Sequence, residues 1–182
     1  IKVQFHWDRE GAHDEHSSCW IRLAQPWAGA GWGFQFIPRV GTEVLVSFLG
    51  GDPDRPVVVG GLYNRIHMPP FPLPFAKTRS GIRTSSTGGG GNELSFEDDA
   101  GNEQIRIYAR RDLEEEVERD ATRLVKGEET SSIKGSRKLT VEGNQQSTVL
   151  GTAGVAVGGN RSVDVRGDDM LLVAGDSTVR QE

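Results

Sequence analysis

The residue types best suited to catalysis lie in residues 13–16, which read HDEH. Two histidines and two carboxylates could bind zinc, as the H-E-x-x-H helix of metalloproteases does. That helix places its histidines four residues apart, whereas His13 and His16 are three residues apart in a polar stretch. We therefore predict an exposed turn without a bound metal. A zinc hydrolase is an alternative that a metal analysis of the purified protein would test.

Three further motifs lack the residues that their chemistry needs. The glycine run 88–91 lacks the Lys-Ser or Lys-Thr of a phosphate-binding loop, and GAGWG at 29–33 lacks the dinucleotide-binding spacing. Asp98 and Asp99 could form an acid–base pair, but they occupy the turn of a predicted hairpin, where aspartate is common. The sequence thus predicts no catalytic residue, no cofactor and no metal site, and a protein that is not an enzyme.

An aromatic set could stack nucleic-acid bases, as some oligonucleotide/oligosaccharide-binding (OB) barrels do; it consists of Trp20, Trp27, Trp32, Phe34 and Phe36. Few lysines or arginines lie between these residues, and the chain carries a net charge of −5. We therefore predict no nucleic-acid partner, and expect the aromatic residues to pack inside a barrel and against neighbouring subunits. An OB-fold nucleic-acid binder is a second alternative.

The composition limits the class of protein. Cys19 is the only cysteine, which excludes a disulfide framework and predicts a small buried apolar residue. No apolar run approaches the ~18–20 residues of a membrane span, and no signal peptide is visible. The chain begins inside an alternating pattern at Ile1 and ends inside a repeat, so we expect a fragment of a longer protein.

The elements that would carry these residues are short strands. Residues 1–66 contain four alternating apolar runs between turns rich in glycine, proline and aspartate, which predicts an OB-fold barrel. Residues 67–92 read as a Pro/Gly-rich linker. Residues 93–124 are expected to form a β-hairpin and the start of a needle. Within them, 110–124 has apolar residues at helical spacing, but Val117 lies eight residues before Val125, and we favour strand.

From residue 125 to 182 the pattern Val-x-Gly recurs every eight residues, with isoleucine once in place of valine. The predicted axial core consists of Val125, Ile133, Val141, Val149, Val157, Val165 and Val173. The repeat glycines are Gly127, Gly135, Gly143, Gly151, Gly159, Gly167 and Gly175. A second inward slot, four residues after each glycine, holds Leu139, Val155, Val163, Leu171 and Val179, and serine in two units.

An even period keeps each side chain on the same face of a strand in every unit. The β-branched residue therefore points inward each time, and glycine allows a kink or a close backbone approach. One chain alone has too little apolar surface to offset the entropy of ordering eight residues per unit. Several chains wound around one axis would pair their strand edges and close the core, so we expect a stiff column of several copies. That the assembly is a homotrimer is inferred partly from this geometry and mostly from a family resemblance.

The sequence resembles the VgrG proteins, the trimeric spikes of bacterial type VI secretion systems, which are related to the puncturing spike of contractile-tailed bacteriophages. The resemblance rests on VQFHWDREG, SSCWIRLAQPWAGAGWG, IPRVGTEVLVSFLGGDPDRPVVVGGLYN and NELSFEDDAGNEQIRIYA, together with the octad repeat. It implies an all-β fold, with an OB-fold barrel followed by a triple-stranded β-helix in an intertwined homotrimer. The phage relatives have a lysozyme domain where this sequence has only STGGGGNE, and some family members have a C-terminal toxin; neither activity is carried over to this chain.

The family further implies a structural, membrane-puncturing role. An N-terminal base domain, missing from this chain, would seat the spike on the tail-tube protein. The far tip would carry a PAAR-type protein or an effector through the target-cell membrane. The spike would be assembled in the bacterial cytoplasm and then injected. A bacteriophage tail spike of the same architecture is a further alternative, which the genomic neighbourhood would distinguish.

Overall fold

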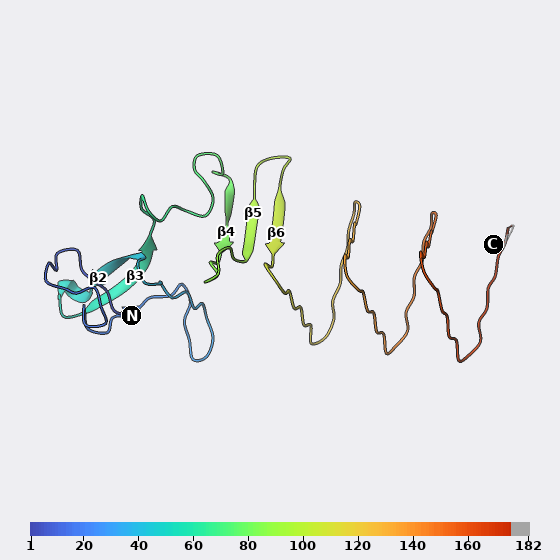
Figure 1. Cartoon of the computed structure of the whole chain (residues 1–182), viewed down its shortest axis with the longest axis horizontal. Coiled ribbons are helices and arrows are strands. Elements are labelled where there is room, and N and C mark those ends of the chain that lie inside the picture. The colour runs from blue at the N-terminus through green and yellow to red at the C-terminus, as the bar shows by residue number, and fades with distance from the viewer. Residues whose placement is uncertain (176–182) are drawn as a thin grey trace. The chain divides into compact units, whose positions relative to one another are not determined.

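The computed structural model describes residues 1–175 and divides the chain into two compact units, Ile1–Asp120 and Ala121–Glu182. The first unit contains two three-stranded sheets, and the second is an extended chain with regular bends (Figure 1). Among the described residues the only helix is a short 3-10 turn, η1 (Leu49–Gly51). No helix in residues 1–175 has the length and apolar character needed to cross a membrane.

The first sheet has the strand order β1-β3-β2 and contains much of the small core. It consists of β1 (Arg22–Leu23), β2 (Glu43–Phe48) and β3 (Pro56–Leu62). β2 and β3 run antiparallel, and β1 lies parallel to β3. The tight connection between β2 and β3 needs glycine, because Gly50 and Gly51 have φ values of 66° and 76°. Ile21 and Val58 are the apolar residues fully buried by this arrangement.

The N-terminal segment is not a regular strand, contrary to its alternating pattern. Ile1 and Ile21 exchange two backbone hydrogen bonds of 2.8 Å, but the next amide, that of Val3, donates to the Ser18 hydroxyl instead. A side chain thus takes the acceptor role that a second strand would supply, and the ladder ends. The described barrel region therefore contains three regular strands.

The second sheet has the order β4-β5-β6, with both pairs antiparallel. β5 (Glu93–Glu97) and β6 (Gln104–Tyr108) form the expected hairpin. β4 (Arg79–Arg83) lies inside the segment 67–92 that we expected to be a linker, and it corrects that expectation. The sequence RSGIR concealed the strand, because it has one large apolar residue and a central glycine. Gly81 has φ 155°, and a Cβ there would lie 2.7 Å from the Cα of Ser95.

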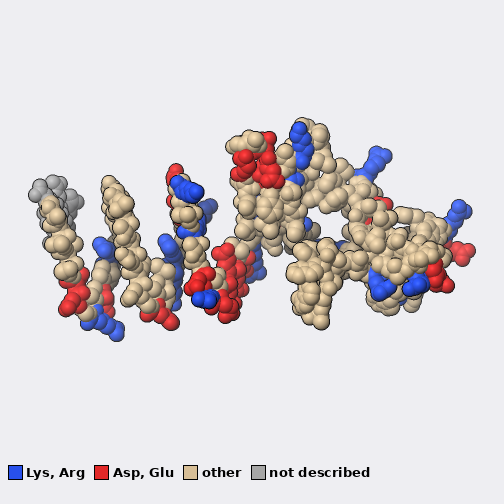
Figure 2. All heavy atoms as spheres, turned by 180° about the vertical axis from the view of Figure 1, so that it is seen from behind, with Lys and Arg blue, Asp and Glu red and all other residues tan. Residues whose placement is uncertain are grey.

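Residues 109–175, which we call the tail, contain no strand or helix. The tail bends once every eight residues, at 126–127 and at each x-Gly pair that follows (Figure 1). Two further bends, at 110–111 and 118–119, have the same eight-residue spacing and precede the first Val-x-Gly unit. Residues 110–124 are therefore neither helical nor a paired strand, and they follow the repeat. Figure 2 shows charged side chains gathered at the start of the tail and around the turn between β5 and β6.

Candidate assembly surface

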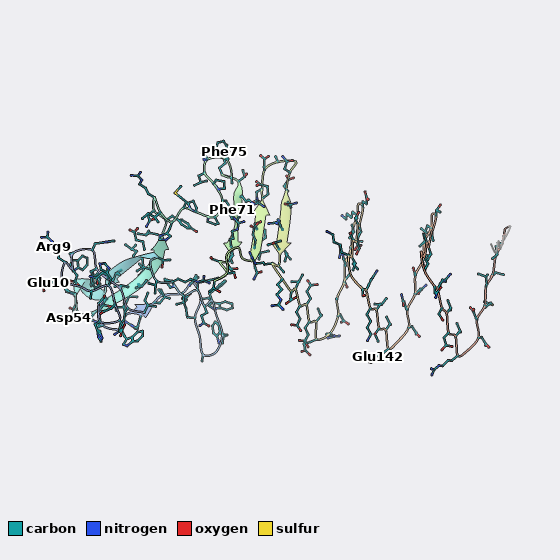
Figure 3. The ribbon with its side chains drawn as sticks, viewed as in Figure 1. Arg9, Glu10, Asp54, Phe71, Phe75 and Glu142 are labelled. Carbon is teal, nitrogen blue, oxygen red and sulfur yellow. The ribbon has the colours of Figure 1, made fainter. Side chains whose placement is uncertain are left out.

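The apolar repeat positions of the tail are not buried within the chain. The seven predicted axial residues are 40–57% exposed, and the described residues of the second slot are 61–87% exposed. Val179 lies outside the described residues. Glu142 lies at one of the bends and can be followed in Figure 3. A regular row of half-exposed β-branched residues is an unusual surface for a monomer, since large contiguous apolar patches mark interaction sites.

The repeat glycines are not explained by the conformation of a single chain. None of the seven has a φ in the left-handed region, and a Cβ built on any of them would meet no atom within 4 Å. The bends at the x-Gly pairs are therefore accessible to other residues. Any steric need for glycine at these positions must come from atoms outside the chain.

The β4-β5-β6 sheet also has an uncovered apolar face. Pairing aligns Ile82 with Leu94 and Leu94 with Ile107, and it aligns Phe96 with Ile105. These five side chains share one face of the sheet and are 38–69% exposed. The sheet thus presents its apolar face outward, the reverse of the usual arrangement in a monomer.

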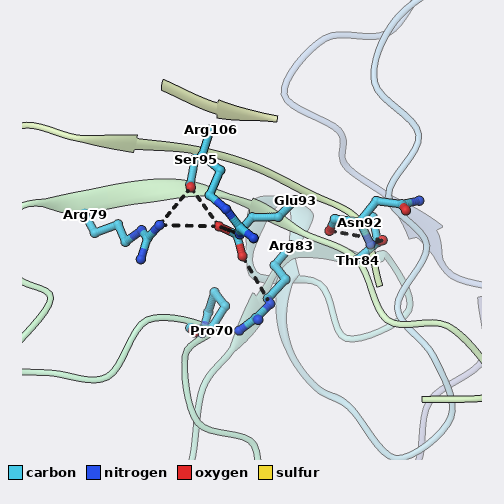
Figure 4. Close-up of polar contacts among 8 residues, drawn as sticks. All are labelled: Pro70, Arg79, Arg83, Thr84, Asn92, Glu93, Ser95 and Arg106. Atoms are coloured by element: carbon cyan, nitrogen blue, oxygen red, sulfur yellow. Dashed lines mark hydrogen bonds and ion pairs between the residues drawn. The ribbon is translucent and has the colours of Figure 1, made fainter. Parts of the chain in front are cut away.

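The opposite face of this sheet is covered and charged (Figure 4). The Glu93 carboxylate is 5% exposed, and three guanidinium groups surround it, those of Arg79 at 3.6 Å, Arg83 at 3.4 Å and Arg106 at 3.0 Å. The Ser95 hydroxyl donates a 2.8 Å hydrogen bond to the same carboxylate. This bond first, and then the Arg106 guanidinium, hold the pKa of Glu93 below its ordinary value against the opposing effect of burial.

The segment before β4 packs over the charged face. Arg83 donates to the carbonyl oxygen of Pro70 at 3.3 Å, and the Arg79 guanidinium lies 5.3 Å from the centre of the Phe71 ring. Phe71 can be located beside β4 in Figure 3. The chain therefore covers the polar face of the sheet with its own residues, although the Arg79 Nε stays without a hydrogen-bond partner among the described residues, and leaves the apolar face uncovered.

The HDEH motif is a polar turn, as predicted. His13 has φ 55°, and the Asp14 carboxylate accepts the His16 amide at 2.8 Å. The Ser17 amide closes the turn on the Asp14 carbonyl at 3.2 Å. Within residues 1–175, no cluster of three or more histidine, cysteine, aspartate or glutamate side chains is arranged to hold a metal ion.

The other rejected motifs also form turns. Asp99 accepts hydrogen bonds from both the backbone and the side chain of Asn102, each at 2.9 Å, in the β5–β6 turn. The run 88–91 forms a loop, which a 2.7 Å hydrogen bond from the backbone amide of Ser86 to the carbonyl oxygen of Gly90 closes. GAGWG lies in a small hairpin, where Trp27 and Trp32 contact edge to face at 4.9 Å.

Two expectations about burial were wrong for the single chain. Cys19 is exposed. The five aromatic residues are 44–79% exposed and do not fill a barrel interior, while their packing against neighbouring subunits stays a prediction. The physical reason is the small size of the three-stranded sheet, whose interior accommodates little more than Ile21 and Val58.

Sequence reasoning missed the Glu93 cluster and left the two upstream bends ambiguous. Glu93 follows a glycine run and carries no apolar signal, and its three arginine partners lie on two other strands. The upstream bends have arginine where the repeat has glycine, at Arg111 and Arg119. The eight-residue interval between Val117 and Val125 was the available signal for them.

Comparison with protein families gives two matches. Residues 1–63 match the type VI secretion system/phage-baseplate injector OB domain. Residues 80–182, more than half of the chain, match the bacteriophage T4 gp5 C-terminal trimerisation domain. Together they confirm the predicted fold class, an OB-fold domain followed by a β-helical trimerisation domain.

Curated relatives align with about two thirds of the chain. The type VI secretion system spike protein VgrG4b of Pseudomonas aeruginosa is 55% identical over 122 residues, which are 66% of this chain and 15% of the relative. The spike protein VgrG3 of Vibrio cholerae is 50% identical over 123 residues, 67% of this chain and 12% of the relative. The actin cross-linking toxin VgrG1 of V. cholerae is 49% identical over 121 residues, 66% of this chain and 11% of the relative. The chain thus spans only a small part of these relatives.

Proposed function

Since the chain belongs to the VgrG family of spike proteins, we propose that it forms the barrel and needle of a type VI secretion spike and acts mechanically, without enzymatic activity. The observation that carries the proposal is the row of axial residues in the tail, 40–57% exposed at a fixed interval of eight residues. Such a row has no use in a monomer. Three copies around one axis would bury it.

The working form is a homotrimer, which the gp5-like trimerisation domain supports. Each tail has unpaired backbone groups along residues 109–175, and neighbouring chains would supply their partners. The homotrimer would also explain the repeat glycines. A Cβ at these bends meets no atom of the single chain, but neighbouring chains could approach the bends closely enough to exclude a side chain. We therefore assign residues 1–66 to the barrel and residues 125–182 to the regular needle, and residues 67–124 form the transition between the two.

The partners follow from the position of such a segment in a spike. A preceding base domain would contact the tail-tube protein, and a PAAR-type protein or an effector would occupy the far tip. Assembly would take place in the bacterial cytoplasm, and sheath contraction would drive the needle through the target membrane. The toxin activity in the name of VgrG1 belongs to that protein and is not transferred to this chain.

Light scattering in native buffer tests the proposal most directly. A trimer of the 19.8 kDa chain has three times that mass. A folded monomer of 19.8 kDa would contradict the proposal.

A bacteriophage tail spike is a second candidate, because the matched OB domain is described for both type VI secretion and phage baseplates. Genes for a contractile sheath and its recycling ATPase beside this gene would favour secretion. Genes for capsid and tail fibres would favour the phage.

A further inference from the structure

An arginine-rich pocket lies at the base of the tail, within the first compact unit. It has a volume of about 720 Å³, and its lining includes Arg39, Arg110 and Arg111 and the hydroxyl-bearing loop 84–86. Asn92 connects two lining segments of the pocket, because its side-chain oxygen accepts a 2.9 Å hydrogen bond from the backbone amide of Arg110. Asp112 is the one carboxylate in the lining, and it pairs with Arg111 at 3.1 Å.

The pocket has more positive than negative charge. Three guanidinium groups against one carboxylate leave a formal charge of +2. Among residues 1–175, Arg39 and Arg110 have no ion-pair partner within 4 Å. Guanidinium groups and hydroxyls together are the donors that bind carboxylates with two or more hydrogen bonds.

The segment that leaves the pocket has the opposite imbalance. Beyond Asp112, residues 113–120, LEEEVERD, contain five acidic residues and one arginine, a net charge of −4. Its ion pair within the segment joins the sequence neighbours Arg119 and Asp120, and Glu114, Glu115, Glu116 and Glu118 have none among the described residues. In a homotrimer three such segments would lie at one level, and their repulsion would require nearby cations.

The acidic segment cannot turn back into the pocket of its own chain. Bends occur at 110–111 and 118–119, and none lies between 112 and 117. An extended backbone advances ~3.3 Å per residue, so Glu116 lies roughly 13 Å from Asp112 along the tail. Strand alternation also puts Glu114 and Glu116 on the face opposite Val117, the residue in step with the axial set.

We propose that the arginine pocket of one chain binds the acidic segment of a second copy, with Glu114 and Glu116 as the carboxylates that face Arg39 and Arg110. The contact rests on the proposed homotrimer. It would join each subunit to its neighbour where the barrel meets the needle, outside the apolar axis. We assign a second copy as the occupant because every chain has the same acidic segment at the same position. The negative charge of that segment complements the positive charge of the pocket.

Cross-linking tests the contact directly. In a Cys19→Ser background, Ser85→Cys combined with Glu116→Cys and a short bismaleimide should give covalent dimers and trimers on a denaturing gel. The matched control, Ser85→Cys with Thr148→Cys, should remain monomeric on the same gel. A wild-type trimer without cross-links at the 85/116 pair would overturn this inference and leave the proposed function intact, whereas a monomeric wild type would overturn both.

Charge exchange gives an independent readout. Arg110→Glu and Glu116→Arg should each raise the trimer dissociation constant by about tenfold or more, and the double variant should recover most of that loss. Arg161→Glu, far along the tail, is the control for a simple change of net charge. Independent losses in the double variant would refute the pairing. So would binding of inorganic phosphate to the wild-type trimer that Arg110→Glu abolishes, because the pocket would then be open.

Discussion

Val157→Asp is the sharpest test of the axial core. Val157 is 49% exposed in the single chain, so the assembly would bury about half of its side chain. Full burial of a valine contributes about 2 kcal/mol, so half of it is about 1 kcal/mol per chain and about 3 kcal/mol per trimer. The three introduced carboxylates each cost about 2 kcal/mol more, either as buried charges or through proton uptake. The expected loss is thus about 9 kcal/mol per trimer.

Urea denaturation at fixed protein concentration, with mass measured by light scattering, is the assay. Ala156→Asp is the matched control, because in an extended backbone neighbouring side chains point to opposite sides, away from each other. The defect of Val157→Asp should shrink as the pH falls toward ~4, because a buried carboxyl has a raised pKa and its protonated form is tolerated better. Equal denaturation midpoints for Val157→Asp and Ala156→Asp would refute the axial assignment.

Three further substitutions test other parts of the molecule. Glu93→Gln should destabilise the first unit at neutral pH by about 1–3 kcal/mol, since it leaves three arginines without their carboxylate. Because folding lowers the Glu93 pKa, the stability advantage of the wild type should be lost as the pH falls from 4.5 through the folded-state pKa. An advantage that acid does not change would contradict this account. Gly81→Ala should cost more than about 1 kcal/mol in thermal denaturation, because its Cβ would collide with β5, and a melting temperature equal to that of Gly101→Ala would argue against the close approach. Gly143→Ala should weaken the trimer in dilution experiments while the circular dichroism of any monomer stays unchanged, since the single chain has room for the Cβ; an unchanged trimer would show that no neighbouring chain approaches there.

The alternating runs predicted the strands that have large apolar residues on one face. Val44, Val46 and Phe48 lie in β2, and the run PVVVGGL is β3. β4 escaped detection because Arg79, Gly81 and Arg83 occupy the face that meets Glu93, and only pairing with β5 reveals their role. Patterns of burial in one segment cannot report a charge cluster that forms between three strands.

The exposure of Cys19 and of the tryptophans has a different origin. Sequence patterns report what a side chain prefers in the final assembly, whereas a single chain buries only what its own sheets can cover. The axial valines are the same case, since their types and spacing indicate a core that one chain does not contain. The two upstream units remained ambiguous because charged residues replace both the glycine and one inward apolar residue, at Arg111 and Glu115.

The two-faced β4-β5-β6 sheet has a consequence for how three chains would align. The octads share their β-branched residue and their glycine at fixed positions, so two tails shifted by eight residues would still match these residues to one another. The sheet occurs once per chain, and its buried Glu93 cluster gives that sheet a defined orientation before any partner arrives. Its uncovered apolar face, present once in each chain, would therefore fix the register in which the three chains pair. Slippage by one unit would misalign a unique surface, and correct pairing would spread along the tail from that end.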